Sequence, residues 1–182
     1  MIAVDTNVLL RYLLNDDAAQ ADTAANLIKG SDTVLITDVV LVEALWTLSG
    51  KKYRLNRDQL AAVVHALFEE PNIRFEDGPA VWMALNDYQE SDGTDFADSL
   101  IINKARAVAK AQDGSFSGSY TFDKAAQKLQ GAKNHRTVVD HASLACNSNK
   151  SDKNGPGLNT QSIEKEIIPI KLTTITQNLH ST

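Results

Sequence analysis

Residues 1–14, MIAVDTNVLLRYLL, show a succession of a short strand and a helix that recurs along the chain. A short apolar run at residues 2–4 is followed at once by Asp5 and then by apolar residues at helical spacing. A short apolar run that ends at a polar residue is typical of a buried strand, and the spacing after it is typical of a helix. Because this succession recurs along the chain, the sequence predicts an α/β fold around a short, mostly parallel sheet.

The expected elements follow from apolar periodicity and from residues that favour helix ends. Thr37 is a good N-cap, and Gly50 is a good stop for the helix that follows it. We expect strands at residues 2–4, 33–36, 72–75, 119–122 and 137–139. We expect helices at residues 7–14, 18–29, 38–49, 57–69, 79–90, 95–111 and 123–129.

The chain divides by composition into a domain and an extension. All aromatic residues lie at or before Phe122, and hydrophobic residues make up 43% of the chain, enough for a sizeable core. Residues 147–161 are polar and contain Gly and Pro, which is typical of a linker. We therefore predict one compact domain at residues 1–140 and a polar, flexible C-terminal extension at residues 141–182.

Charge and cysteine content restrict the classes of function. The formal net charge is −5, so the chain has no overall basic character with which to bind nucleic acid. A single cysteine, Cys146, excludes an intramolecular disulfide and fits a reducing cytoplasm. The N-terminal stretch lacks a basic segment, and no apolar run approaches the ~20 residues of a membrane helix. We expect a cytoplasmic protein without membrane contact.

Two acidic side chains follow predicted strands directly. Asp5 follows the strand at residues 2–4, and Asp123 follows the strand at residues 119–122. Ligands of open α/β sheets bind beyond the carboxyl ends of the strands, so both carboxylates are candidates for one site. Each is equally well explained as a helix N-cap, a position that favours Asp.

Two further acids lie in predicted helices. Glu43 is the only charged residue among the apolar residues 39–46, where an unpaired buried carboxylate costs several kcal/mol. It therefore faces either solvent or a cation. Asp98 lies one turn inside the helix at residues 95–111, whose buried stripe we expect to contain Phe96, Leu100, Ile101, Ala105 and Val108. Asp95, three residues earlier, is explained equally well by compensation of the helix dipole.

The four acidic residues, in a sequence without a group of Cys and His ligands, favour a metal site for a hard divalent cation. His65 is the only histidine in residues 1–134, so a zinc site with nitrogen or sulfur ligands is not expected. Carboxylate oxygens suit Mg²⁺ or Mn²⁺. Such an ion relieves the repulsion between the acids and can activate a water molecule for attack on phosphorus.

The ordered motifs resemble the PIN-domain family, most closely the VapC-type toxins of bacterial toxin–antitoxin pairs. The similarity rests on DTN at residues 5–7, Glu43 in an apolar helix, DFADSLI at residues 95–101 and TFD at residues 121–123. It covers roughly residues 1–134 and has no counterpart for the residues that follow. Each motif is weak alone, and the ordered set is specific.

The resemblance implies a three-layer α/β/α fold and an endoribonuclease that uses one or two Mg²⁺ or Mn²⁺ ions. It implies metal ligands at Asp5 and Asp98, and further catalytic acids at Glu43 and Asp123. It implies supporting roles for Asn7, Asp95 and Thr121. It also implies RNA as substrate, a cognate antitoxin as partner and a homodimer.

Basic and aromatic side chains supply candidate RNA contacts. Arg11 and Lys104 lie within two helical turns of predicted acids and can hold phosphates. Tyr12 and Trp46 can stack a base, although core packing is the stronger expectation for both. The full set of candidate cations is Arg11, Lys51, Lys52, Arg54, Lys104 and Arg106, and an ordinary solvated surface explains most of them.

Three other functions compete with the ribonuclease. The first is a catalytically inactive PIN-fold module that binds nucleic acid or a partner. The second is a phosphatase of the aspartyl-phosphate type, which needs an acid where this chain has Asn7. The third is a DNA nuclease, because carboxylate–metal chemistry does not itself select the 2′-hydroxyl.

Overall fold

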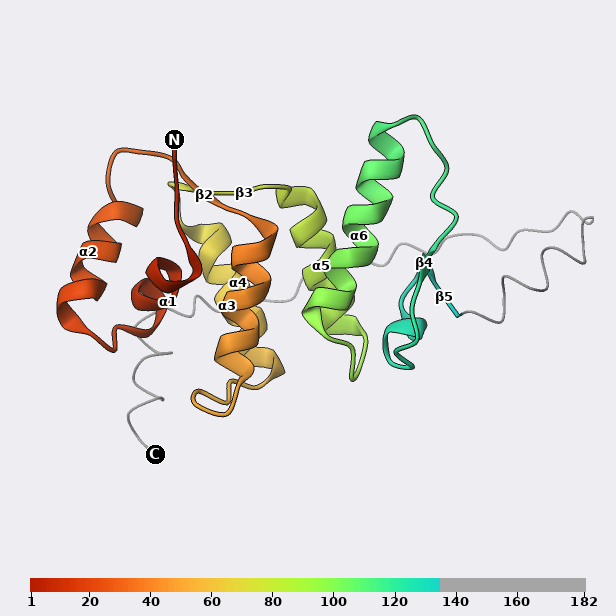
Figure 1. Ribbon diagram of the computed structural model, residues 1–182, viewed down its shortest axis with the longest axis horizontal. Coiled ribbons are helices and arrows are strands. Elements are labelled where there is room, and N and C mark those ends of the chain that lie inside the picture. Colours follow the sequence, from red (N-terminus) through yellow and green to blue (C-terminus); the bar gives the residue numbers. More distant parts are fainter. Residues whose placement is uncertain (135–182) are drawn as a thin grey trace, which may run out of the picture.

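The computed structural model describes residues 1–134, and each structural statement below concerns that part of the chain. Its helices follow one another along the long axis of the molecule, from α2 at one end to α6 near the other (Figure 1). The helices are α1 (Thr6–Leu14), α2 (Ala18–Ile28), α3 (Asp38–Ser49), α4 (Arg57–Glu69), α5 (Gly78–Glu90) and α6 (Phe96–Ala111). Each helix begins and ends within one residue of its predicted bounds.

Three short parallel strands form the main sheet. They are β1 (Ile2–Ala3), β2 (Val34–Ile36) and β3 (Ile73–Phe75), in the order β1-β2-β3. In the register, Val34 lies opposite both Ile2 and Ile73. The central strand β2 is buried at both ends, since Val34 and Ile36 have no exposed surface. The expected α/β class with parallel pairing is therefore confirmed.

Local capping explains where several helices begin. The Asp5 carboxylate accepts a hydrogen bond from the Val8 amide at 2.8 Å and so caps α1. Thr37 caps α3 as predicted, through the Val40 amide. These side chains satisfy backbone amides that lack a partner in the first helical turn.

A second sheet lies apart from the first. The strand β4 (Ser119–Tyr120) pairs in parallel with β5 (Ala132–Lys133), and the 3-10 helix η1 (Ala126–Lys128) lies between them in the chain. The predicted strand at residues 119–122 is thus shorter, and the predicted helix at residues 123–129 is reduced to η1. The sequence analysis missed β5, and its predicted strand at residues 137–139 lies outside the described residues.

The main core runs from β1 to the first half of α6. Its completely buried members include Leu9, Ile28, Leu41 and Leu85, and burial of each such side chain contributes roughly 1.5–3 kcal/mol. A smaller set of buried residues, Ile102, Ala126 and Leu129, lies outside this cluster.

Two burial predictions were wrong. In α6, Phe96 and Leu100 are buried, but Ile101 is 58% exposed and Val108 is 50% exposed. The helix packs through Phe96, Ser99, Leu100, Ile102 and Asn103 instead. Trp46, for which we expected core packing, is 76% exposed, because α3 buries its Leu41, Ala44, Leu45 and Leu48 side.

The described helices are all unsuited to crossing a bilayer. Within residues 1–134, none has both the length and the continuous apolar character that a membrane span requires.

Candidate acidic site

Glu43 is linked to the start of α1, directly after Asp5. The Thr6 hydroxyl donates a hydrogen bond to the Glu43 carboxylate at 2.6 Å, which links α1 to α3. Asp5 immediately precedes Thr6 and uses Oδ1 for its cap. The structure thus confirms the capping interpretation of Asp5, and this role occupies only one of the two carboxylate oxygens. Both acids have exposed side chains, so Glu43 avoids burial of its charge.

Asp95, Asp98 and Asp123 form a second acidic group. Asp95 is the N-cap residue of α6 but makes no side-chain cap hydrogen bond. Asp98 lies in the first turn of the same helix and is only partly exposed. Burial raises the pKa of the Asp98 carboxyl, and the nearby charges of Asp123 and Asp95 raise it further. The three carboxylates therefore place negative charges close enough to affect one another.

The backbone around Asp123 is held by its own side chain and by Thr121. The Asp123 carboxylate accepts hydrogen bonds from the amides of Ala125 at 2.6 Å and Ala126 at 3.1 Å. The Asp123 amide donates to the Thr121 hydroxyl at 3.0 Å. Thr121 therefore fixes the turn that presents Asp123.

The structure keeps the two acidic groups apart. Neither Asp5 nor Glu43 contributes to the pKa shift of Asp98. Within residues 1–134, no three metal-binding side chains lie close enough to hold one ion. The reason lies in the topology, because Asp5 follows β1 in the main sheet and Asp123 follows β4 in the separate sheet. The donor chemistry suits Mg²⁺ or Mn²⁺, but one ion held by both groups requires them to come closer together.

Arg57 shapes the loop before the second group, and the sequence analysis missed it. Its guanidinium donates hydrogen bonds to the carbonyls of Tyr88, Ser91 and Thr94, the last two at 2.5 Å. It also lies over the Tyr88 ring, 3.8 Å from the centroid. These contacts order the segment that leads into Asp95. No local sequence signal marks this role, because Arg57 also looks like an ordinary first-turn helix residue.

A cavity of about 430 Å³ separates α3 from the start of α6. Its lining includes Trp46 on α3, Arg57 on α4 and the residues around Asp95. Ligand pockets of proteins commonly have such volumes. The exposed Trp46 side chain therefore lies beside the loop that carries the second acidic group.

Lys104, predicted as a phosphate contact, lies among three carboxylates. Its ammonium lies 2.8 Å from Asp38 Oδ2, 3.5 Å from Asp77 Oδ2 and 3.6 Å from Glu76 Oε1. The hydrogen bond to Asp38 is the main cause of its raised pKa. Since three carboxylates surround the charge, Lys104 instead ties α6 to the starts of α3 and α5. Sequence spacing cannot show partners that lie on other elements.

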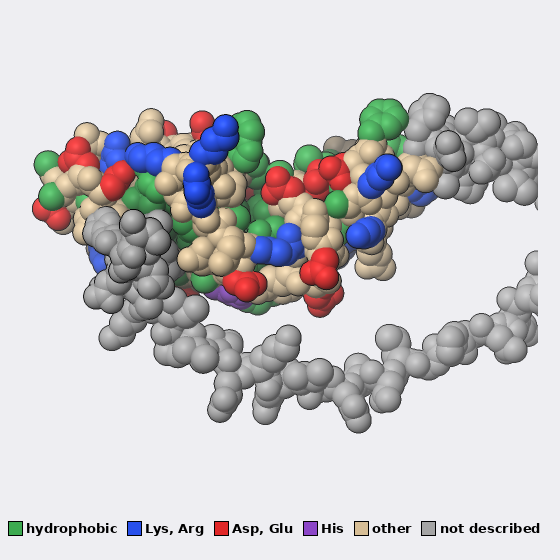
Figure 2. Space-filling model, turned by 90° about the horizontal axis from the view of Figure 1, so that it is seen from below, with side chains coloured by type: hydrophobic (Ala, Val, Ile, Leu, Met, Phe, Trp, Pro, Cys, Tyr) green, Lys and Arg blue, Asp and Glu red, His purple; other side chains and the backbone are tan. Residues whose placement is uncertain are grey.

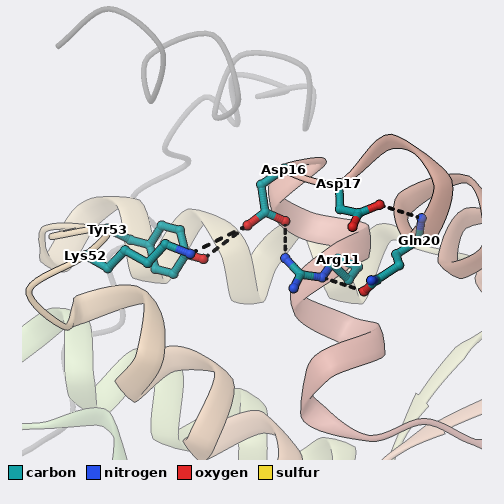
Figure 3. A network of polar contacts seen from close by, with 6 residues as sticks. All are labelled: Arg11, Asp16, Asp17, Gln20, Lys52 and Tyr53. Atoms are coloured by element: carbon teal, nitrogen blue, oxygen red, sulfur yellow. Dashed lines mark hydrogen bonds and ion pairs between the residues drawn. The ribbon is translucent and has the colours of Figure 1, made fainter.

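Arg11 belongs to a polar network at the end of α1. Its Nη1 lies 2.5 Å from Asp16 Oδ1, and its Nε donates to Gln20 at 2.9 Å (Figure 3). Tyr53 donates from the other side to Asp16 Oδ2 at 3.3 Å. Asn7, predicted to support the site, lines a cavity of about 340 Å³ together with Arg11.

Acidic and basic side chains are interspersed on the face of the molecule that Figure 2 shows. Figure 2 shows Lys and Arg interspersed with Asp and Glu on the face in view, rather than gathered into one basic area. This agrees with the formal net charge of −5. A polyanionic ligand would therefore depend on local groups of cations.

Comparison with known proteins adds one finding. The family model described as PIN domain matches residues 2–116, more than half of the chain. The matched span includes Asp5, Glu43, Asp95 and Asp98, whereas Asp123 lies beyond it. No curated protein and no solved structure matches the chain.

Proposed function

Because the chain belongs to the PIN-domain family, whose members are generally nucleases, we propose that it is a Mg²⁺- or Mn²⁺-dependent endoribonuclease. We further propose that it is the toxin component of a toxin–antitoxin pair. The observation that carries the proposal is the environment of Asp98. Its partly buried carboxylate lies near those of Asp95 and Asp123, whose charges raise its pKa beyond the effect of burial. A divalent cation is the counterion that best relieves such repulsion.

The acids have distinct roles in this proposal. Asp5 and Asp98 would hold the ion, and Glu43 and Asp123 would complete its surroundings, partly through water. The bound ion would lower the pKa of a water molecule and stabilise charge on the phosphate. Thr6 orients Glu43, Thr121 orients Asp123, and Arg57 orders the loop before Asp95. Asn7, two residues after Asp5, would support the site from the same end of α1.

The proposed partners follow from this function. RNA is the substrate, and a cognate antitoxin is the protein partner. We also propose a homodimer and a cytoplasmic location. The exposed Ile101 and Val108 on α6 give this surface apolar area that a protein contact would bury. Light scattering during gel filtration would measure the oligomeric state directly.

Cleavage of defined RNA and DNA strands tests the proposal. The full chain is incubated with Mg²⁺, Mn²⁺ or EDTA, and the variants Asp5→Ala and Asp98→Asn are compared with wild type. We expect RNA cleavage that EDTA abolishes and that each variant lowers by at least about 100-fold. Asp32→Asn, at an exposed acid outside both groups, is the matched control and should cleave as wild type does. Full activity in Asp5→Ala would refute the role of the acids.

One observation favours a second candidate, the catalytically inactive module. The two acidic groups are separate, and the described residues include no assembled metal site. Under this alternative the protein binds RNA or a partner without cutting. RNA binding without cleavage under every metal condition would support it.

A further inference from the structure

The cavity beside Asn7 has the composition of an anion site. It has a volume of about 340 Å³ and is lined by Asn7, Leu10, Arg11, Thr47, Gly50, Lys51, Lys52 and Tyr53. Three of these eight residues are cations. In a chain with a formal net charge of −5, such a gathering of positive charge is local and distinct.

Residues 50–53 line this cavity, and we refer to the segment 50–54, GKKYR, as the basic turn. The amides of Tyr53 and Arg54 donate to the Gly50 carbonyl, and the Leu55 amide donates back to the Leu48 carbonyl. The fold therefore fixes the backbone of the turn close against the end of α3. Its three cations are presented by an ordered loop.

Asp16 ties the basic turn to α1. It accepts hydrogen bonds from Arg11 and from Tyr53, and Lys52 Nζ lies 3.9 Å from it (Figure 3). Lys52 Nζ also lies over the Tyr53 ring, 4.7 Å from the centroid, so one face of the ring is covered. Lys51 is exposed and takes part in no ion pair within residues 1–134. Its charge is therefore available to a ligand.

The cavity is lined by residues that follow the first acidic pair along α1 and α3. Asn7 is two residues from Asp5, and Thr47 is four residues from Glu43 on the same helix. Residues four apart share a helix face, so Thr47 follows Glu43 at a distance of about 6 Å along α3. A strand whose phosphate lay at the acids would reach the cavity with its next phosphates.

We propose that this cavity binds a backbone phosphate of a single-stranded RNA whose neighbouring phosphodiester lies at Asp5 and Glu43. Lys51 and Lys52 supply the charge, and Arg11 and Tyr53 shape the wall. The inference rests on the proposed ribonuclease function. It explains how an acidic protein holds a polyanion beside a group of carboxylates, because cations just beyond the end of α3 offset the repulsion.

The binding test uses the full chain in EDTA, so that no strand is cut. Fluorescence anisotropy with a labelled single-stranded RNA is measured over a range of salt concentrations. For Lys51→Gln with Lys52→Gln we expect about tenfold weaker binding at low salt. The slope of log affinity against log salt should fall by about 1.4, because each cation on a single-strand phosphate contributes about 0.7. The matched control is Lys29→Gln with Lys110→Gln, which removes two exposed lysines elsewhere and should bind like wild type.

A second measurement separates this inference from the proposed function. With Mg²⁺, the double variant should raise KM about tenfold and keep kcat within about twofold of wild type, because it leaves the acids intact. Wild-type binding and salt slope in the double variant would overturn the phosphate site. Loss of binding to poly-glutamate, with RNA binding intact, would assign the cavity to an acidic peptide instead. Absence of any cleavage by wild type would contradict the ribonuclease alone.

Discussion

Replacing Arg57 by methionine is expected to lower the free energy of unfolding by about 2–4 kcal/mol. The guanidinium donates hydrogen bonds to the carbonyls of Tyr88, Ser91 and Thr94. Methionine keeps much of the aliphatic stem but provides no donor. The three carbonyls then lose a charged partner at the end of α5, where helical carbonyls already lack one.

The magnitude follows from these contacts. A hydrogen bond to a charged group contributes about 1.5–3 kcal/mol, and a partly exposed cation over an aromatic ring about 0.5–1 kcal/mol. The simple total is an upper bound, because contacts of one side chain are not additive. Water can also reach part of this loop, since Arg57 itself is only half-buried. These two effects bring the expected loss to about 2–4 kcal/mol.

Urea denaturation of the full chain, followed by far-UV circular dichroism, measures the effect. The slope m should stay constant while the midpoint falls. Arg57→Lys should lose about half as much, because one ammonium keeps the charge but cannot serve three carbonyls. Arg74→Met is the matched control. Arg74 is exposed and donates only to the nearby carbonyls of Pro71 and Ile73, so its loss should be under about 0.5 kcal/mol.

A stability of Arg57→Met within about 0.5 kcal/mol of wild type would refute this reasoning. The same substitution also tests the link from loop to site. Since Arg57 orders the segment that leads into Asp95, cleavage should fall in Arg57→Lys under conditions where that variant is fully folded. Full cleavage in this folded variant would mean that the loop does not position the acids.

Three further predictions concern charge and metal. Without metal, Asp98→Asn should raise the free energy of unfolding at pH 7, because the raised pKa of Asp98 in the folded state means that its ionised form destabilises that state. The gain should vanish below about pH 4, where the carboxyl is protonated in both states, and a pH-independent gain in urea titrations would contradict this. Asp16→Asn should lower the free energy of unfolding by no more than about 1 kcal/mol at pH 7, because the hydrogen bond from Arg11 is the main cause of the lowered pKa of Asp16. This loss should disappear as the pH falls below about 4, and an equal loss at pH 3 would exclude the ion pair as its cause. In a Trp82→Phe variant, where Trp46 is the remaining tryptophan, saturating Mg²⁺ should shift the fluorescence emission to shorter wavelength, because the acidic groups approach across the cavity between α3 and α6. A metal-induced rise in thermal stability without an emission shift would show that metal binding leaves this cavity open.

The sequence determined the bounds of α1–α6 and of β1–β3 to within about one residue, but not those of η1 and β5. Helix bounds depend on apolar periodicity and on caps, and both are set by residues about four positions apart. Thr37 at the start of α3 and Gly50 at its end are examples, and the structure places both as predicted. The order of the acidic motifs also sufficed to indicate the PIN-domain family, which the family match confirms.

Tertiary structure alone decided which of these residues meet. Whether β4 joins β1 or pairs with β5 depends on contacts between segments about a hundred residues apart, and this choice places Asp5 and Asp123 at different sheets. In the same way, Lys104 contacts carboxylates and Arg57 contacts carbonyls that lie on other elements of the fold. Trp46 became exposed because α3 packs through its other side. Long-range pairing of this kind leaves no local pattern in the sequence, since the interacting groups are brought together only by the fold.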